Sequence, residues 1–214
     1  MTGLDKLTGN IRACTLCEDQ GLIPQARPVF QIGSGARVGI FGQAPGNLAH
    51  QTRKPFNDPS GVRLREWMGL TEEEFYDPAK LAIVPMAFCF PGYDGKSPTG
   101  KGGDLPPPPL CAQTWRQDVM QVLLPQLELV FLIGNYAQRW HLASKMERTL
   151  TDTVRKWHTF IEEAESSSQT IMIPLPHPSW RNNAWLKKNP WFEDDLLPEI
   201  RVRIRKLIDF QAKP

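Results

Sequence analysis

The sequence predicts an α/β fold built on a four-stranded parallel sheet, in a single domain spanning residues 1–214. Three observations support this fold: short apolar runs, helical patterns between them, and a length that suits one ordinary α/β domain. Each apolar run ends at a turn-forming or polar residue, as expected for strands buried on both faces of a parallel sheet. The runs lie at residues 37–41, 81–86, 127–133 and 171–175.

Helical patterns fill the intervals between these strands, as in a βαβ fold. The pattern at 114–124 is stopped by Pro125, and the pattern at 135–146 directly follows the third strand. A closing amphipathic helix at 196–210 has a strongly basic face. The other predicted helices lie at 61–68 and 150–161. The aromatic residues expected to pack against the closing helix are Trp185, Trp191 and Phe192.

The composition excludes several classes of protein. Hydrophobic residues make up 41% of the chain and charged residues 22%, which is typical of globular proteins and excludes a disordered or fibrous chain. The longest apolar stretch, at 127–133, is interrupted by Glu128 and is far shorter than the roughly 20 residues of a membrane-spanning helix. The N-terminus lacks the basic start and apolar run of a secretory signal, so we expect a cytoplasmic protein without disulfides.

The charge and the loop composition suggest where a ligand binds. The net charge of +2 neither demands nor excludes a nucleic-acid partner, although eight basic residues accompany five acidic ones from Arg181 onward. Prolines and glycines cluster at 91–109 and 42–46, which predicts long, ordered loops. Because ligands bind beyond the carboxyl ends of parallel strands, the segments that follow the four strands are expected to converge on one crevice. These segments are 42–46, 88–92, 134–136 and 176–180.

Four cysteines form a candidate metal site. Cys14 and Cys17 make a C-x-x-C pair near the N-terminus, and Cys89 and Cys111 flank the loop rich in proline and glycine. Four thiolates from two loops can hold Zn²⁺ or a [4Fe-4S] cluster, and their spacing alone does not separate the two. The alternative is four unrelated buried thiols. Thioredoxin-like chemistry has less support, since the C-x-x-C precedes the first predicted strand.

Motifs from four parts of the chain point to one family. The first is Gly42-Gln43-Ala44-Pro45-Gly46, and the pair Pro55-Phe56 follows ten residues beyond its last glycine. His177-Pro178-Ser179 comes after the fourth strand, and the cysteines follow the order described above. With these motifs the chain resembles the uracil-DNA glycosylase superfamily, closest to the iron-sulfur (family 4) branch. The resemblance implies a three-layer α/β sandwich with a central four-stranded parallel sheet, and a [4Fe-4S] cluster on the four cysteines, with zinc as the less favoured occupant.

The resemblance also implies roles for the motif residues. Phe56 would stack on the extruded base, His177 would donate a hydrogen bond to a carbonyl of the leaving base, and Gln43 would orient the attacking water. Each has a plainer alternative: a core phenylalanine, a structural histidine and a turn residue. The other substrate-binding candidates are Gly42, Ala44, Pro45, Gly46, Asn135 and Ser179, of which the glycines and Pro45 would allow close approach of the backbone.

Beyond His177, the resemblance predicts a loop that contacts DNA. The candidates for DNA contact are Trp180, Arg181, Lys187 and Lys188, the first as a wedge in the duplex and the lysines near phosphates. The alternative for the lysines is an ordinary solvated face. The cluster itself would be structural, anchoring the N-terminal arm and the loop at 92–109.

The predicted function is a DNA glycosylase of base-excision repair, which hydrolyses the N-glycosidic bond of uracil or a related deaminated base after base flipping. Its expected partner is DNA that contains a deaminated base, with no membrane partner, and the chain is expected to be a monomer. Three positions depart from the branch: Gln43 replaces a Glu, Pro85 replaces an Asn that reads the pyrimidine, and His50 replaces an acidic residue. These departures leave open a retuned substrate preference, or a catalytically weak or inactive iron-sulfur protein that binds nucleic acid. A hydrolase of free nucleosides is a third possibility.

Overall fold

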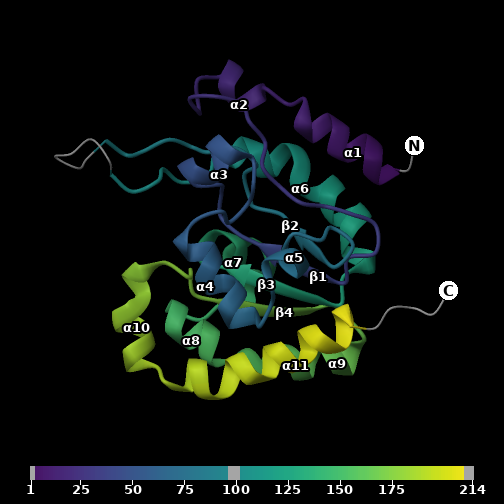
Figure 1. Ribbon diagram of the computed structural model, residues 1–214, viewed down its shortest axis with the longest axis vertical. Coiled ribbons are helices and arrows are strands. Elements are labelled where there is room, and N and C mark those ends of the chain that lie inside the picture. Colours follow the sequence, from purple (N-terminus) through teal and green to yellow (C-terminus); the bar gives the residue numbers. More distant parts are fainter. Residues whose placement is uncertain (1–2, 96–101, 210–214) are drawn as a thin grey trace.

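The computed structural model describes residues 3–95 and 102–209, and its centre is a parallel sheet with the strand order β2-β1-β3-β4 (Figure 1). The strands are β1 (Val38–Phe41), β2 (Leu81–Ile83), β3 (Leu129–Ile133) and β4 (Ile171–Leu175). The predicted α/β fold and all four predicted strands are therefore confirmed. The second strand is shorter than predicted because the chain reaches Pro85, which has no N–H to donate to a ladder.

Helices cover both faces of the sheet and make the predicted three layers (Figure 1). One face packs against α4 (Pro59–Met68), α5 (Glu72–Phe75), α8 (Leu150–Arg155) and α11 (Leu197–Ile208). The other face packs against α1 (Gly3–Arg12), α6 (Pro109–Leu123) and α7 (Asn135–Leu142). Helix α9 (Trp157–Ser167) packs along β4 and contributes to both cores.

Short helices lie at the loops around the sheet. They are α2 (Leu16–Asp19), α3 (Asn47–Thr52), α10 (Asn183–Lys188), three 3₁₀ turns η1 (Leu124–Gln126), η2 (Ala143–Lys145) and η3 (Trp180–Asn182), and a π-helical turn η4 (Phe192–Leu196). The N-terminal helices and α3, α5 and α10 were not predicted, because most are too short to show a period of 3.6 residues. None of the helices in residues 3–95 and 102–209 has the length and apolar character needed to cross a membrane.

Several predicted helices are real but have different ends. The predicted helix at 114–124 begins earlier, at Pro109, because proline is well suited to the first turn of a helix. The helix predicted at 135–146 ends at Leu142, and the one predicted at 150–161 divides into α8 and α9 at Lys156. The closing helix, predicted at 196–210, lies at 197–208. Residue 210 of the predicted range falls outside the described residues. Phe192 is fully buried, with Trp185 and Trp191 packed against the same core as α11, as predicted.

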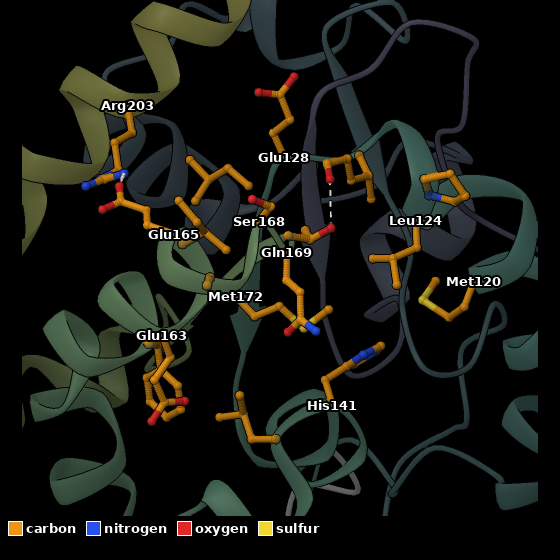
Figure 2. A pocket seen from close by; sticks show the side chains of 18 of the residues that line it. Met120, Leu124, Glu128, His141, Glu163, Glu165, Ser168, Gln169, Met172 and Arg203 are labelled. Carbon is orange, nitrogen blue, oxygen red and sulfur yellow. Dashed lines mark hydrogen bonds and ion pairs between the residues drawn. The ribbon is translucent and has the colours of Figure 1, made fainter.

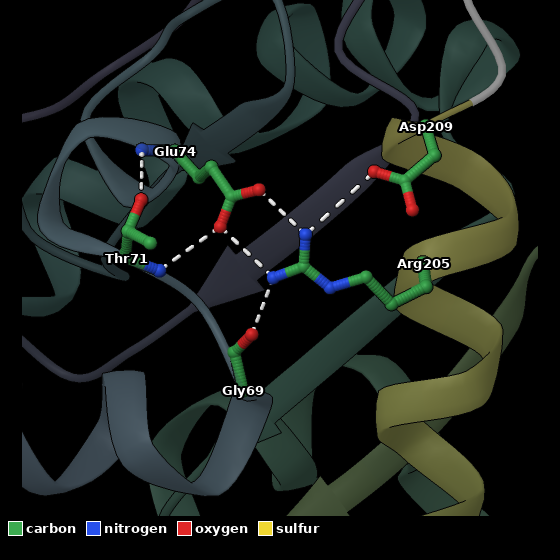
Figure 3. Close-up of polar contacts among 5 residues, drawn as sticks. All are labelled: Gly69, Thr71, Glu74, Arg205 and Asp209. Atoms are coloured by element: carbon green, nitrogen blue, oxygen red, sulfur yellow. Dashed lines mark hydrogen bonds and ion pairs between the residues drawn. The ribbon is translucent and has the colours of Figure 1, made fainter.

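A polar clamp joins α11 to the chain between α4 and α5 (Figure 3). The guanidinium of Arg205 donates to both carboxylate oxygens of Glu74, at 2.5 and 2.9 Å, and to the backbone oxygen of Gly69. Thr71 and Glu74 also form a capping box at the start of α5. The hydrogen bond from Arg205 is the largest cause of a low pKa at Glu74, about 2. This clamp holds the closing helix on its face of the sheet.

We expect Glu74→Gln to lower the free energy of unfolding at pH 7 by about 1 kcal/mol, because Gln keeps the capping box but loses the charge pair, which solvent partly screens. Since the pKa of Glu74 is depressed from 4.5 to about 2, its contribution is present above pH 4.5 and is lost as the pH falls toward 2. Urea unfolding at several pH values measures the difference between the two proteins. Glu163→Gln, at an exposed pair with Lys145, is the control and should change stability by less than about 0.5 kcal/mol. A difference between wild type and Glu74→Gln that persists unchanged to pH 2 would contradict the assignment.

Candidate active site and cysteine cavity

A cavity of about 260 Å³ lies at the carboxyl ends of the central strands. Ile83 ends β2, Ile133 ends β3, and both line the cavity, as does the loop that follows β1. This is the place where the sequence predicted that the strand ends would converge. The predicted site residues that line it are Gly42, Gln43, Ala44, Pro45, Gly46, Phe56 and His177.

The glycine-rich loop is held by the segment that follows β2. The N–H of Met86 donates to the oxygen of Gly42 at 2.9 Å, and the N–H of Ala87 donates to the oxygen of Gln43 at 3.0 Å. Gly46 then starts α3 with extended backbone geometry. Because both loop carbonyls are anchored, Gln43 sits on a fixed backbone at the cavity wall.

Phe56 is held in a strained conformation beside this loop. Its φ of 51° lies in the left-handed region, which a bulky side chain rarely adopts without support. The hydroxyl of Tyr76 supplies this support, because its one proton is shared between the backbone oxygens of Pro55 and Phe56, which lie 3.0 and 3.2 Å from the hydroxyl oxygen. A Cβ added at Gly61 would lie 1.7 Å from the oxygen of Phe56, so only glycine fits there. The ring of Phe56 is thereby placed against Gly42, where an added Cβ would be 3.6 Å from Cζ.

His177 follows the end of β4 and is exposed on the cavity wall. Desolvation of the imidazole by the surrounding protein lowers its pKa, and the nearby carboxylate of Asp58 opposes this shift. The ring is therefore neutral at neutral pH. The backbone around it is fixed, because the side chain of Asn182 donates to the oxygen of His177 at 2.6 Å and Arg63 of α4 donates to the oxygen of Ser179 at 3.1 Å.

Two of the predicted substrate-binding residues are not among those that line the cavity. Asn135 is exposed at the first position of α7, and the hydroxyl of Ser179 accepts a hydrogen bond from the N–H of Arg181 at 3.3 Å. Ser179 thus acts as the cap of the 3₁₀ turn η3.

The sequence analysis missed two carboxylates of the cavity, Asp58 and Asp104. Asp58 is the N-cap of α4 and accepts a hydrogen bond from the N–H of Gly61 at 2.9 Å. Asp104 forms an isolated antiparallel β-bridge with Tyr93. Burial raises the pKa of its carboxyl group; the charge of Arg181 opposes this shift, and the charge of Asp58 adds to it. The segment Asp58-Pro59-Ser60-Gly61 is a recognisable helix start, so a capping signal for Asp58 was present in the sequence. Asp104 had no local signal, since only its distant bridge to Tyr93 brings it to the cavity.

The predicted DNA-contacting residues are all exposed, and Arg181 lies next to a residue of the cavity. The side chain of Trp180 is 71% exposed, and the guanidinium of Arg181 lies 5.9 Å from the centre of its ring. Arg181 also lies beside Gly103 and interacts with Asp104 of the cavity. Lys187 and Lys188 are exposed at the end of α10, on the same side of the molecule as α3 and α4 (Figure 1).

The four cysteines surround a second, small apolar cavity between the N-terminal arm and α6. N–H groups face three of the sulfurs. Trp115 Nε1 donates to Cys14 Sγ at 3.4 Å, and the backbone N–H of Phe88 donates to Cys111 Sγ at 3.4 Å. The backbone of Arg27 forms a hydrogen bond with Cys89. Burial, with a further contribution from the neighbouring cysteines, raises the pKa of Cys89 to about 11 and that of Cys111 to about 12. Among the described residues, no three His, Cys, Asp or Glu side chains are grouped as a site for a metal ion. The four cysteines thus share one small cavity, and N–H groups face the sulfurs of Cys14, Cys89 and Cys111.

A larger hollow lies elsewhere, at the other ends of β3 and β4 (Figure 2). Its volume is about 1080 Å³, and Glu128, Thr170 and Ile171 mark the start of the two strands in its wall. It contains none of the predicted site residues. The smaller cavity at the strand ends is therefore the better candidate for an active site.

Comparison with known families agrees with this geometry. A model of the uracil DNA glycosylase superfamily matches residues 30–201. The matched region contains all four strands, every residue of the cavity from Gly42 onward, and the cysteines Cys89 and Cys111, whereas Cys14 and Cys17 precede it. The match covers well over half of the chain, so the protein belongs to the uracil-DNA glycosylase superfamily.

Proposed function

We propose that this chain is a DNA glycosylase of base-excision repair, which flips uracil or a related deaminated base into the cavity and hydrolyses its N-glycosidic bond. One observation carries the proposal: a single cavity holds a stacking ring on a strained backbone, a neutral imidazole, and two carboxylates. Such a reaction needs a pocket that orients the base, stabilises negative charge on it and places a water at the sugar carbon.

The base would be held chiefly by its faces. Phe56 supplies a rigid aromatic surface, and Val29, Ile83, Pro85 and Ile133 supply apolar contacts. A volume of about 260 Å³ is near the small end for ligand pockets, which suits one flat base. The end of β2 presents Pro85 where the branch has an amide that reads the pyrimidine, so recognition of the base edge falls to Gln43 and to the polar rim.

His177 would stabilise the negative charge that develops on the departing base. A neutral imidazole can donate one hydrogen bond to a carbonyl oxygen without first losing a proton. The lowered pKa keeps His177 in this form at neutral pH. Its fixed backbone means that little reorganisation is needed during the reaction.

The two carboxylates would act on the sugar side. An oxocarbenium-like sugar is positively charged, so the negative charge of Asp58 favours its formation. Gln43 does not ionise, but its amide can accept one hydrogen bond and donate another to orient the attacking water. The absence of a Glu at position 43 is therefore compensated by carboxylates from other segments of the cavity.

The surface beside the cavity would bind the DNA around the extruded nucleotide. Trp180 is the proposed wedge at the vacated position of the stack, and Arg181, Lys187 and Lys188 are proposed to contact phosphates. The exposure of all four side chains supports this role.

We also place the protein in the iron-sulfur branch, with a [4Fe-4S] cluster held by Cys14, Cys17, Cys89 and Cys111. The four sulfurs share one apolar cavity, and N–H groups face three of them, which supports the assignment. Such a group would join the N-terminal arm to α6 and to the segment after β2. Its contribution would be structural, because no step of the proposed reaction requires an electron.

Wild-type protein should release the base from oligonucleotides that contain uracil, hypoxanthine or xanthine, and His177→Ala should lose about 100-fold of that rate. Base release from single- and double-stranded labelled substrates measures this directly, with circular dichroism as a control for folding. If folded wild type releases no base but binds the oligonucleotides, the second candidate holds: a non-catalytic nucleic-acid-binding protein, favoured by Gln43 and Pro85.

Asp58→Asn should reduce the rate of base release by about 100-fold, because it removes the carboxylate charge that is proposed to favour the sugar cation. Asn caps a helix as well as Asp does, so the stability of α4 should change by less than about 0.5 kcal/mol. Asp152→Asn in the first turn of α8 is a matched control, because Asp152 does not line the cavity, and it should leave the rate unchanged. Equal activity of Asp58→Asn and wild type would remove Asp58 from the mechanism.

Protein purified without oxygen should show a broad absorbance near 400 nm, and Cys111→Ser should lose most of it together with iron. Metal analysis and thermal unfolding complete the measurement, since loss of the group should also lower the melting temperature. A colourless protein that contains one zinc ion would refute the iron-sulfur assignment, and an unchanged metal content in Cys111→Ser would refute the ligand set.

A further inference from the structure

A fully buried arginine lies behind the floor of the active-site cavity. Arg116 of α6 is 2% exposed, and within the described residues no carboxylate forms an ion pair with it. A charge without an ionic partner in the interior is expensive, and proteins usually avoid it. Burial lowers the pKa of this guanidinium to about 9, which still leaves it charged at neutral pH. Packing alone therefore does not explain why a charged side chain is buried at this position.

On one side, the guanidinium is held by a histidine. Arg116 Nε donates to His141 Nε2 at 3.2 Å, so this ring nitrogen carries a lone pair and the imidazole is neutral. Burial, together with the charge of Arg116, lowers the pKa of His141 to about 3. The imidazole points from α7 toward Met120 and Leu124, in the wall of the hollow at the other ends of β3 and β4 (Figure 2). His141 thus accepts a hydrogen bond and leaves the positive charge on Arg116.

On the other side, the guanidinium contacts the residues that form the cavity floor. Its Nη1 donates to the backbone oxygens of Val84 and Pro85, each at 3.4 Å. Its Cζ lies 4.4 Å from the centre of the ring of Phe41, the residue directly before Gly42. Pro85 itself lines the cavity, as does Gly42, so the charge lies directly behind residues of the cavity wall.

We propose that Arg116 is a positioning residue for base release, which holds the cavity floor through Val84 and Pro85 and places a fixed positive charge behind it that stabilises the anionic leaving base. This inference rests on the glycosylase function proposed above. It concerns a residue that does not contact the substrate and that belongs to none of the motifs of the chain.

The physical argument depends on distance and on the medium. A base that leaves from a sugar carries a full negative charge, and a fixed charge behind the cavity wall, in a poorly polarisable interior, acts on it without contact. A neutral donor such as Gln would satisfy a backbone carbonyl without bringing a charge. An arginine at this position therefore supplies a positive charge in addition to the hydrogen bonds that the carbonyls need. Buried charges of this kind depart from the usual rules of packing, and such departures concentrate at functional sites.

The test compares two leaving groups in single-turnover base release. Fluorine withdraws electrons from the ring, so the 5-fluorouracil anion needs less stabilisation than the uracil anion. We expect Arg116→Gln to slow the release of uracil by about 10-fold or more. The loss of rate with 5-fluorouracil should be smaller than the loss with uracil, by a factor of about five. Arg116→Lys, which keeps the charge, should preserve the ratio of the two rates.

The controls separate this role from a structural one. Arg203→Gln removes a cation of α11 that is paired with Glu165 and Glu199, and it should leave both rates unchanged. Arg116→Met is a second uncharged variant, because apolar replacements of buried charges are often tolerated. Visible absorbance of each variant reports on the cysteine cavity, since Cys111 lies on the same helix and interacts with Arg116.

Each outcome decides the proposal. Equal losses on the two bases, or no loss, would overturn it and leave Arg116 as a structural residue only. Loss of the visible absorbance in folded Arg116→Gln would also overturn it, because Arg116 would then serve the cysteines. If wild type releases neither base, the glycosylase function fails and this inference with it, whereas an active wild type with equally affected variants would overturn this inference alone.

Discussion

The chain directly after β2 joins the two cavities of this molecule, and its backbone hydrogen bonds determine the geometry of both. Met86 and Ala87 donate to the carbonyls of the glycine-rich loop, which fixes the backbone of Gln43. Phe88 then donates to the sulfur of Cys111, and Cys89 itself faces the cysteine cavity. Because one short segment serves both cavities, the proposed cluster on the cysteines would also restrain the wall of the active-site cavity.

The active-site cavity brings together groups of different charge. Carboxylates from two segments line it, and a neutral imidazole from the end of β4 lies near one of them, Asp58. Arg116 adds a buried positive charge behind the floor, on the side of β2. Charges of both signs in and behind one cavity suit the proposed reaction, which would separate an anionic base from a cationic sugar, and they are worth more in a cavity than in water.

Strain and rigidity are combined at Phe56. Its left-handed backbone is stable only because Tyr76 shares its hydroxyl proton between two consecutive carbonyls and Gly61 leaves room for one of them. Tyr76 lies at the end of α5, whose capping box and clamp to α11 hold it in place. The position of the stacking ring thus depends on contacts that reach the closing helix of the chain, about 150 residues away in sequence.

The sequence by itself determined the parallel sheet, the glycine-rich loop, Phe56 and His177, because each has a local signature: an apolar run, turn-forming residues or a short motif. Only the tertiary structure decided which of the predicted residues share the cavity, and it left Asn135 and Ser179 outside it. It also revealed Asp104 and Arg116, which no spacing along the chain marks. Asp104 reaches the cavity through a bridge to Tyr93, and Arg116 gains its meaning from the carbonyls of Val84 and Pro85. Contacts between segments far apart in sequence leave no periodic pattern, so the local sequence predicts the elements, while packing decides which side chains meet.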